Sequence, residues 1–183
     1  MLFEEIVLTP EEDLVIQALN IIEPGIERIA TSGGERWRMG SSRSGSRGGL
    51  LLKCKDVGDR IPIGSLGDGI WRLLGLALAL VRSADGVVLI DEIDTGLHYS
   101  VMEKMWSLVA ETARRLNIQV FATTHSRDCY ESLGVACRSV DSQRGEITIQ
   151  RLEKGKQRST VYYEPEIRAI RESRLEQNRF EVR

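Results

Sequence analysis

Two adjacent acids, Asp91 and Glu92, follow four apolar residues at 87–90 and give the strongest chemical signal in the chain. Val, Val, Leu and Ile favour a strand that is buried on both faces. Such a strand has no structural use for two carboxylates at its end, because unpaired buried charge is costly. Asp91 could hold Mg²⁺, directly or through water, and Glu92 could orient and deprotonate an attacking water. The alternative is a strand that ends at the surface with two solvated acids.

A loop of small residues at 65–69 (Ser-Leu-Gly-Asp-Gly) precedes an apolar segment that predicts a helix over about 70–82. Gly67 and Gly69 would let a ligand approach the backbone closely. The free N–H groups and the positive dipole end of the helix would suit a phosphate. Ser65 adds a hydroxyl donor. The alternative is an ordinary glycine-rich turn that caps a helix.

A second short apolar strand, predicted over 118–123, ends in Thr-Thr-His-Ser at 123–126. Ser126 can cap the next helix, which has Asp128 in its first turn. His125 would then lie at the end of a strand, where open α/β sheets place their ligands. We expect the other histidine, His98, to pack against or cap the helix that follows it, with a direct role at the site as the alternative.

Three segments occur in a suggestive order: 65–69 (Ser-Leu-Gly-Asp-Gly), 89–98 (Leu-Ile-Asp-Glu-Ile-Asp-Thr-Gly-Leu-His) and 123–126 (Thr-Thr-His-Ser). Together they resemble the C-terminal half of an ABC-type ATPase head. The most similar branch is the soluble AAA-family ATP-binding proteins related to the OLD, RecF and SMC heads. The resemblance covers roughly residues 1–140 and implies an α/β fold, a partial P-loop NTPase, that uses ATP and Mg²⁺.

The resemblance also implies roles for individual residues. Asp91 matches the magnesium residue of the Walker B element, and Glu92 matches the catalytic glutamate. Asp94 falls in the D-loop, which communicates across the dimer in this family. His125 matches the switch histidine that senses the γ-phosphate.

The loop at 65–69 matches the signature loop of the family, which contacts the γ-phosphate of ATP bound to the opposite subunit. Ser65, Gly67 and Gly69 are the matching positions. Leu66 replaces the first glycine of the usual Ser-Gly-Gly core, as is typical of the soluble branch.

The sequence contains no Gly-x-x-x-x-Gly-Lys-[Ser/Thr] element, which the P-loop requires. Residues 40–47 have the glycine spacing but lack the lysine, so we interpret them as a basic hairpin loop. The chain is then a fragment, one half of a split ATPase, or a degenerate relative. We expect it to need a Walker A half for activity and to be inactive in isolation.

Composition indicates a single domain over residues 1–183, because a chain of this length can bury a sizeable core. A net charge of −2 argues against strong electrostatic binding of nucleic acid, although a local basic patch is possible at Arg36, Arg38, Arg43 and Arg47. The three cysteines have no metal-ligand spacing, which favours free thiols and a cytoplasmic location. The longest apolar stretch, 73–81, is too short to cross a bilayer.

The predicted elements divide the chain into three segments: 9–83, 84–140 and 141–183. The first holds a helix, opened by a capping box at 9–12, then an antiparallel meander and the helix after the loop. The second is a βαβ unit with parallel strands, and the third is a β-hairpin followed by a helix. The predicted strands are 26–30, 35–39, 50–55, 61–63, 87–91, 118–123, 146–152 and 159–163, and the helix between the two parallel strands is 100–116.

These features predict a soluble ATPase that works as an ATP-gated dimer switch, as a homodimer or with a Walker A-bearing partner half. One alternative is a non-catalytic module that docks a partner subunit through an ATPase-like surface. Another is the ATPase component of a DNA repair or anti-phage system, with nucleic acid as a possible partner.

Overall fold

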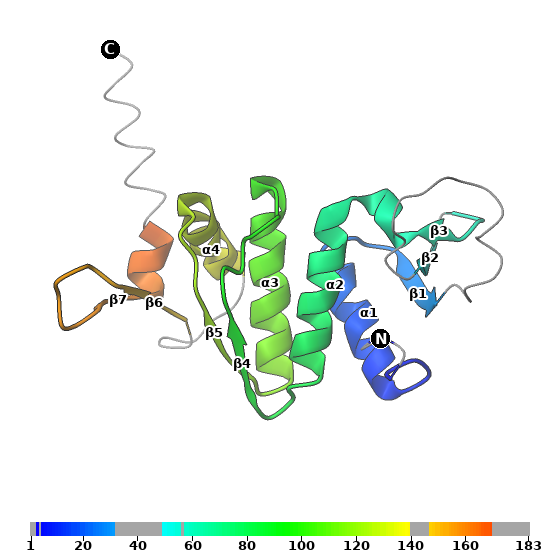
Figure 1. Ribbon diagram of the computed structural model, residues 1–183, viewed down its shortest axis with the longest axis horizontal. Helices are drawn as coiled ribbons and strands as arrows, with labels where there is room; N and C mark the ends of the chain where they lie inside the picture. Colours follow the sequence, from blue (N-terminus) through cyan, green and yellow to red (C-terminus); the bar gives the residue numbers. More distant parts are fainter. Residues whose placement is uncertain (1–2, 4, 32–48, 56, 140–146, 170–183) are drawn as a thin grey trace, which may run out of the picture. The chain divides into compact units, whose positions relative to one another are not determined.

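The computed structural model describes residues 3, 5–31, 49–55, 57–139 and 147–169 (Figure 1). The chain is mixed α/β, as predicted, and forms two compact units, 1–89 with 112–121 and 90–111 with 122–183. Compact units are not by themselves separate domains, so the single domain stays a prediction. The elements are α1 (Pro10–Asn20), β1 (Ile26–Thr31), β2 (Leu50–Cys54), β3 (Ile61–Pro62), η2 (Ile63–Leu66), α2 (Asp68–Val81), β4 (Val87–Ile90), α3 (Tyr99–Arg115), β5 (Gln119–Ala122), α4 (Arg127–Ser139), β6 (Thr148–Arg151) and β7 (Thr160–Tyr163).

The first unit contains the predicted antiparallel meander, in which β2 pairs with both β1 and β3. Helices α1 and α2 lie side by side in this unit (Figure 1). Their facing apolar residues are buried, as expected for a helix as apolar as α2. The predicted strand at 35–39, the loop at 40–47 and the four arginines of the possible basic patch lie outside the described residues.

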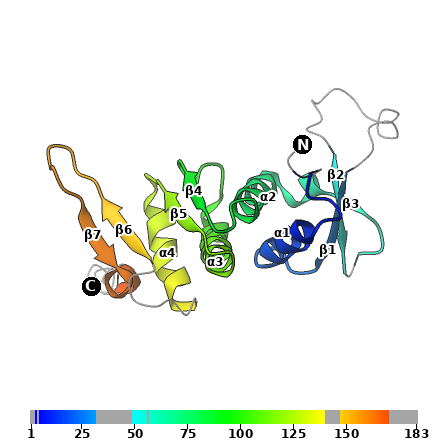
Figure 2. The ribbon, with the colours of Figure 1, turned by 90° about the horizontal axis from the view of Figure 1, so that it is seen from below.

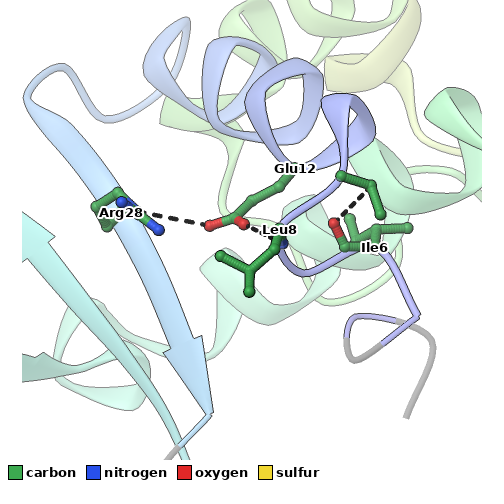
Figure 3. A network of polar contacts seen from close by, with 5 residues as sticks. Ile6, Leu8, Glu12 and Arg28 are labelled. Atoms are coloured by element: carbon green, nitrogen blue, oxygen red, sulfur yellow. Dashed lines mark hydrogen bonds and ion pairs between the residues drawn. The ribbon is translucent and has the colours of Figure 1, made fainter.

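The capping box predicted at 9–12 is not formed. The Thr9 hydroxyl donates to the carbonyl of Ile6 (2.7 Å) and makes no side-chain cap. The Glu12 carboxylate accepts the N–H of Leu8 (2.7 Å), because Leu8 has a left-handed backbone (φ 64°) that turns this N–H toward it. Glu12 is only 4% exposed and also lies 3.8 Å from Nε of Arg28 on β1, so its carboxylate sits between helix and strand (Figure 3).

Strands β4 and β5 are parallel, as predicted, with α3 as the crossover between them. The N–H of Gln119 donates to the carbonyl of Gly86, and that of Thr123 donates to the carbonyl of Ile90, so the register advances in the same direction along both strands. Asn117 adopts a left-handed backbone (φ 53°) just after α3, a common way to end a helix.

The prediction that residues 87–90 are buried on both faces is wrong. Val88 is buried, but Val87 is 56% and Leu89 78% exposed, and Phe121 on β5 is 51% exposed. Side chains alternate between the two faces of a strand. Within the described residues only the Val88 face is covered, and the other face presents apolar side chains to solvent.

The second unit contains the predicted hairpin of β6 and β7, in which Thr148 pairs with Tyr163. Figure 2 shows β7 leading into a helical segment, which spans 164–169. Leu133 and Cys137 of α4 form a small core with Ile167 of this segment, and residues from the hairpin and α3 pack against it. No helix in the described part of the chain is long and apolar enough to span a membrane.

Candidate functional site

Thr123, the first residue after β5, holds the two acids that follow β4. Its hydroxyl donates to Oδ1 of Asp91 (2.5 Å) and accepts the N–H of Glu92 (2.9 Å). Its backbone carbonyl accepts the N–H of Ile93 (3.1 Å). The parallel pairing of β4 and β5 therefore brings both predicted acids beside the start of the Thr-Thr-His-Ser segment.

Glu92 has a left-handed backbone (φ 47°), which is unfavourable for a residue with a Cβ atom. Two hydrogen bonds hold it in this bend. One is the N–H bond to Thr123, and the other runs from the Thr95 hydroxyl to Oε2 of Glu92 (3.0 Å). The side chain is exposed, so its second carboxylate oxygen can meet a water or a ligand.

Asp94 is held by the next threonine along the chain. The Thr124 hydroxyl donates to Oδ1 of Asp94 (2.5 Å) and accepts the N–H of Ser126 (3.0 Å). The Ser126 hydroxyl accepts the N–H of Cys129 (3.3 Å), which confirms the predicted cap of α4. The sequence showed both threonines as hydroxyls at a strand end, but the pattern gave them no role.

His125 lies between these two anchored residues, and its side chain is exposed. It makes no hydrogen bond or ion pair with any other described residue, so its ring is available to a ligand. His98 has the predicted capping role, because its Nδ1 lies 2.9 Å from the Ser100 hydroxyl and accepts the Ser100 N–H (3.4 Å) at the start of α3.

The loop at 65–69 lies in the first unit and is shorter than predicted. Ser65 and Leu66 belong to the 3-10 turn η2, and α2 begins at Asp68, so Gly69 lies in the first helical turn. The reason is Gly67, whose φ of 90° reverses the chain and lets the helix start at the next residue. No side chain caps α2, and Ser65 and Gly67 are exposed. The first N–H groups of α2 thus have no side-chain acceptor within the described residues.

The oxygen ligands at the strand ends suit a small hard cation better than a transition metal. Asp91 supplies an exposed carboxylate, and the Thr123 hydroxyl oxygen lies beside it. No group of three or more His, Cys, Asp or Glu side chains that could hold a metal lies among the described residues. Mg²⁺ fits this arrangement, since it is commonly held by one or two carboxylates together with waters and substrate phosphates.

Cys129, at the start of α4, is not a candidate nucleophile. Burial raises the pKa of its thiol to about 11, although a hydrogen bond with Thr124 acts in the opposite direction. The thiolate is the reactive form of cysteine. The thiol therefore stays protonated and unreactive near neutral pH.

Comparison with known proteins gives two matches in sequence. Residues 55–128 match the family model described as "AAA domain, putative AbiEii toxin, Type IV TA system". An "ATP/GTP phosphatase" of Helicobacter pylori is 33% identical over 95 residues, which cover 50% of this chain and 26% of that protein. The chain therefore spans about a quarter of the length of this curated relative. The match to the family model includes Asp91 and Glu92.

Among solved structures, the chain is similar to one from a study of ATP-driven dimerization and DNA-stimulated activation of SMC ATPases. The TM-score is 0.50 at 15% identity, over 89% of each chain. An SMC head bound to the C-winged helix domain of ScpA has a TM-score of 0.47 at 18% identity, over 84% of this chain and 41% of that one. The first of these likenesses shows that the fold is similar to that of an SMC ATPase.

Proposed function

We propose that this chain, which is similar to an AAA domain, to an ATP/GTP phosphatase and to an SMC ATPase, is the catalytic half of an ATP-hydrolysing dimer switch. In this proposal it supplies the Walker B acids, the switch histidine and the signature loop. A Walker A half, carried by a partner segment or subunit, makes most of the contacts that bind the ATP phosphates. ATP binding closes the dimer, and hydrolysis opens it.

The observation that carries the proposal is the pair of threonine hydroxyls that joins the ends of β4 and β5. Thr123 holds Asp91 and Glu92, and Thr124 holds Asp94. His125 follows directly in the chain. Three acids and one imidazole, matched to the ATPase motifs by type and order, are thus tied to one pair of strand ends. A structural role alone gives no reason for this concentration of titratable groups.

The proposed chemistry assigns one task to each side chain. Glu92 orients water in line with the γ-phosphate and accepts its proton. His125 donates a hydrogen bond to the phosphate oxygens, where charge develops during transfer. Asp91 would hold Mg²⁺, which when bound supplies positive charge beside the phosphate oxygens.

The loop at 65–69 is proposed to act on the ATP held by the second subunit. The uncapped start of α2 presents N–H groups and a positive dipole end, which suit a phosphate. The exposed Ser65 hydroxyl adds a donor. Two copies of the site would then share two ATP molecules, and Asp94 would communicate between them.

The uncovered face of β4 and β5 supports the need for a Walker A half. Val87, Leu89 and Phe121 are all more than half exposed on these strands. Contiguous exposed apolar residues commonly mark an interaction site. A Walker A-bearing segment that packed there would bury these side chains.

The substitution Glu92→Gln tests the proposal in the chain combined with its Walker A-bearing partner polypeptide. We expect the variant to bind ATP and dimerise, as seen by equilibrium binding and light scattering, but to hydrolyse ATP at least about a hundredfold more slowly. Glu103→Gln, the same change at an exposed carboxylate of α3, is the matched control and should leave turnover unchanged. Wild-type turnover in Glu92→Gln would remove Glu92 from the mechanism.

A second candidate function places this ATPase switch in a defence or DNA-repair system. The family description names a toxin of a Type IV toxin–antitoxin system, which favours this setting. Fluorescence anisotropy with short DNA at low and moderate salt tests direct contact with nucleic acid. Binding that depends on ATP and on Glu92 would support this function, and an absence of binding under all conditions would oppose it.

A further inference from the structure

Thr123 contacts four consecutive residues at the end of β4. Its N–H donates to the carbonyl of Ile90 (2.9 Å), and its carbonyl accepts the N–H of Ile93 (3.1 Å). Its hydroxyl bridges the two residues between them, Asp91 and Glu92. The backbone contacts extend the pairing of the strands, but the hydroxyl contacts are made by the side chain alone, so a substitution can remove them separately.

The direction of the hydrogen bonds at this hydroxyl is fixed. The Glu92 N–H can only donate, so the hydroxyl oxygen accepts it. The single hydroxyl hydrogen then goes to the Asp91 carboxylate. The two hydrogen bonds, from amide to hydroxyl and from hydroxyl to carboxylate, are cooperative, and the second is charge-assisted, so each bond strengthens the other.

The bridge coincides with the unfavourable backbone of Glu92 (φ 47°). An ordinary extended or helical backbone at position 92 would point the carboxylate in another direction from the strand end. The Thr123 hydroxyl holds the peptide before Glu92, and the Thr123 carbonyl holds the peptide after it, so the two bonds together favour the backbone conformation in which the Glu92 side chain leaves the strand end as observed. The same hydroxyl restricts rotation of the Asp91 carboxylate.

We propose that Thr123 is a positioning residue that sets the directions of both Asp91 and Glu92 through one hydroxyl. Its effect on catalysis rests on the proposed function, whereas its effect on the two acids does not. Thr123 does not itself need to touch ATP or metal in this role. The Thr123 hydroxyl, and not the shape of the side chain, sets the directions of the two acids.

The test compares Thr123→Val, which keeps the branched shape, with Thr123→Ser, which keeps the hydroxyl. The readout is NMR of the full chain without nucleotide. We expect Thr123→Val to speed exchange of the Glu92 amide about five- to tenfold, as for loss of one hydrogen bond. It should also weaken the strong intraresidue amide-to-Hα NOE that a left-handed backbone gives. Thr123→Ser should behave like wild type.

The matched control is Thr112→Val on α3. Thr112 is fully buried, and its hydroxyl has no hydrogen-bond partner in the described part of the chain. This variant should leave the Glu92 amide unchanged. Unchanged exchange and NOE in Thr123→Val, or failure of Thr123→Ser to keep both, would overturn the positioning role.

Hydrolysis measured in the chain combined with its Walker A-bearing partner separates this inference from the proposed function. We expect Thr123→Val to lower kcat about tenfold with a smaller effect on the KM for ATP, because the direction of Glu92 affects the water more than ATP binding. If Glu92→Gln abolishes hydrolysis but Thr123→Val does not slow it, the positioning role fails alone. If Glu92→Gln hydrolyses normally, the proposed function fails, and the NMR result still decides whether Thr123 orients the acids.

Discussion

The Thr124 hydroxyl donates to the Asp94 carboxylate at 2.5 Å and at the same time accepts the Ser126 N–H at 3.0 Å. It therefore ties the turn after β4 to the start of α4. His125 lies between Thr124 and Ser126 in the chain. The position of the His125 backbone thus depends on Thr124, which makes no hydrogen bond with the imidazole ring in the described part of the chain.

Replacing Thr124 with valine should loosen this link while keeping the shape of the side chain. Asp94 is half-buried, so loss of a hydrogen bond to its carboxylate should lower the free energy of unfolding by about 1–2 kcal/mol. Urea denaturation followed by circular dichroism measures the change. Thr124→Ser is the control and should lose less than half as much. An unchanged free energy of unfolding in Thr124→Val would exclude the hydroxyl bonds as a source of stability.

Glu12 and Arg28 should differ sharply in their contributions to stability. Glu12→Ala leaves the N–H of Leu8 without its acceptor and should cost about 1–3 kcal/mol of unfolding free energy. Arg28→Ala should cost less than about 1 kcal/mol, because the arginine side chain is 63% exposed and its Nε lies 3.8 Å from the carboxylate. Thermal or urea unfolding of both variants checks the order. A larger loss in Arg28→Ala would mean that the ion pair dominates.

Two helical glycines should respond in opposite directions to substitution by alanine. A Cβ at Gly134 of α4 would lie 2.6 Å from the carbonyl oxygen of Ile167, so Gly134→Ala should destabilise the chain by about 1–3 kcal/mol. A Cβ at Gly75 of α2 would meet nothing within 4 Å, so Gly75→Ala should stabilise it by about 0.5–1 kcal/mol. Melting temperatures of the two variants test the pair. A neutral Gly134→Ala would show that the segment at 164–169 moves freely aside.

Stability should fall at alkaline pH because of the buried thiols. Burial raises the pKa of Cys137 from 9.0 to about 11 in the folded chain. The unfolded thiol loses its proton first, so the stabilisation is complete below pH 9 and is lost as the pH rises through about 11. Urea unfolding at several pH values above about 8 should show this decline, and Cys137→Ala should make it shallower. An identical pH dependence in the variant would exclude Cys137 as a contributor.

Much of the fold could be predicted because its signals are local. Apolar runs at 87–90 and 119–122, separated by an amphipathic helix, predict the parallel unit, and β6 and β7 follow from alternation around a turn. The acids and His125 could be placed at strand ends for the same reason. In the structure Thr123 and Thr124, which precede His125 in the chain, contact the acids after β4.

The rest depends on contacts that no local pattern contains. The roles of Thr123 and Thr124 depend on the register between two strands thirty residues apart, and a hydroxyl carries no sign of its partner. The left-handed turn at Leu8 redirected the Glu12 carboxylate away from the predicted capping box. The exposure of Val87 and Leu89 could not be predicted because an apolar strand has the same sequence whether one face is covered or both.

The left-handed backbone at position 92 lowers the stability of the folded chain, whereas the proposed chemistry requires a glutamate at that position. Glycine would occupy a φ of 47° more comfortably than glutamate, by about 1 kcal/mol. A search for more stable variants of this chain should therefore tend to replace the residue that we propose activates the water. Thermostability gained at this position would mark a loss of turnover.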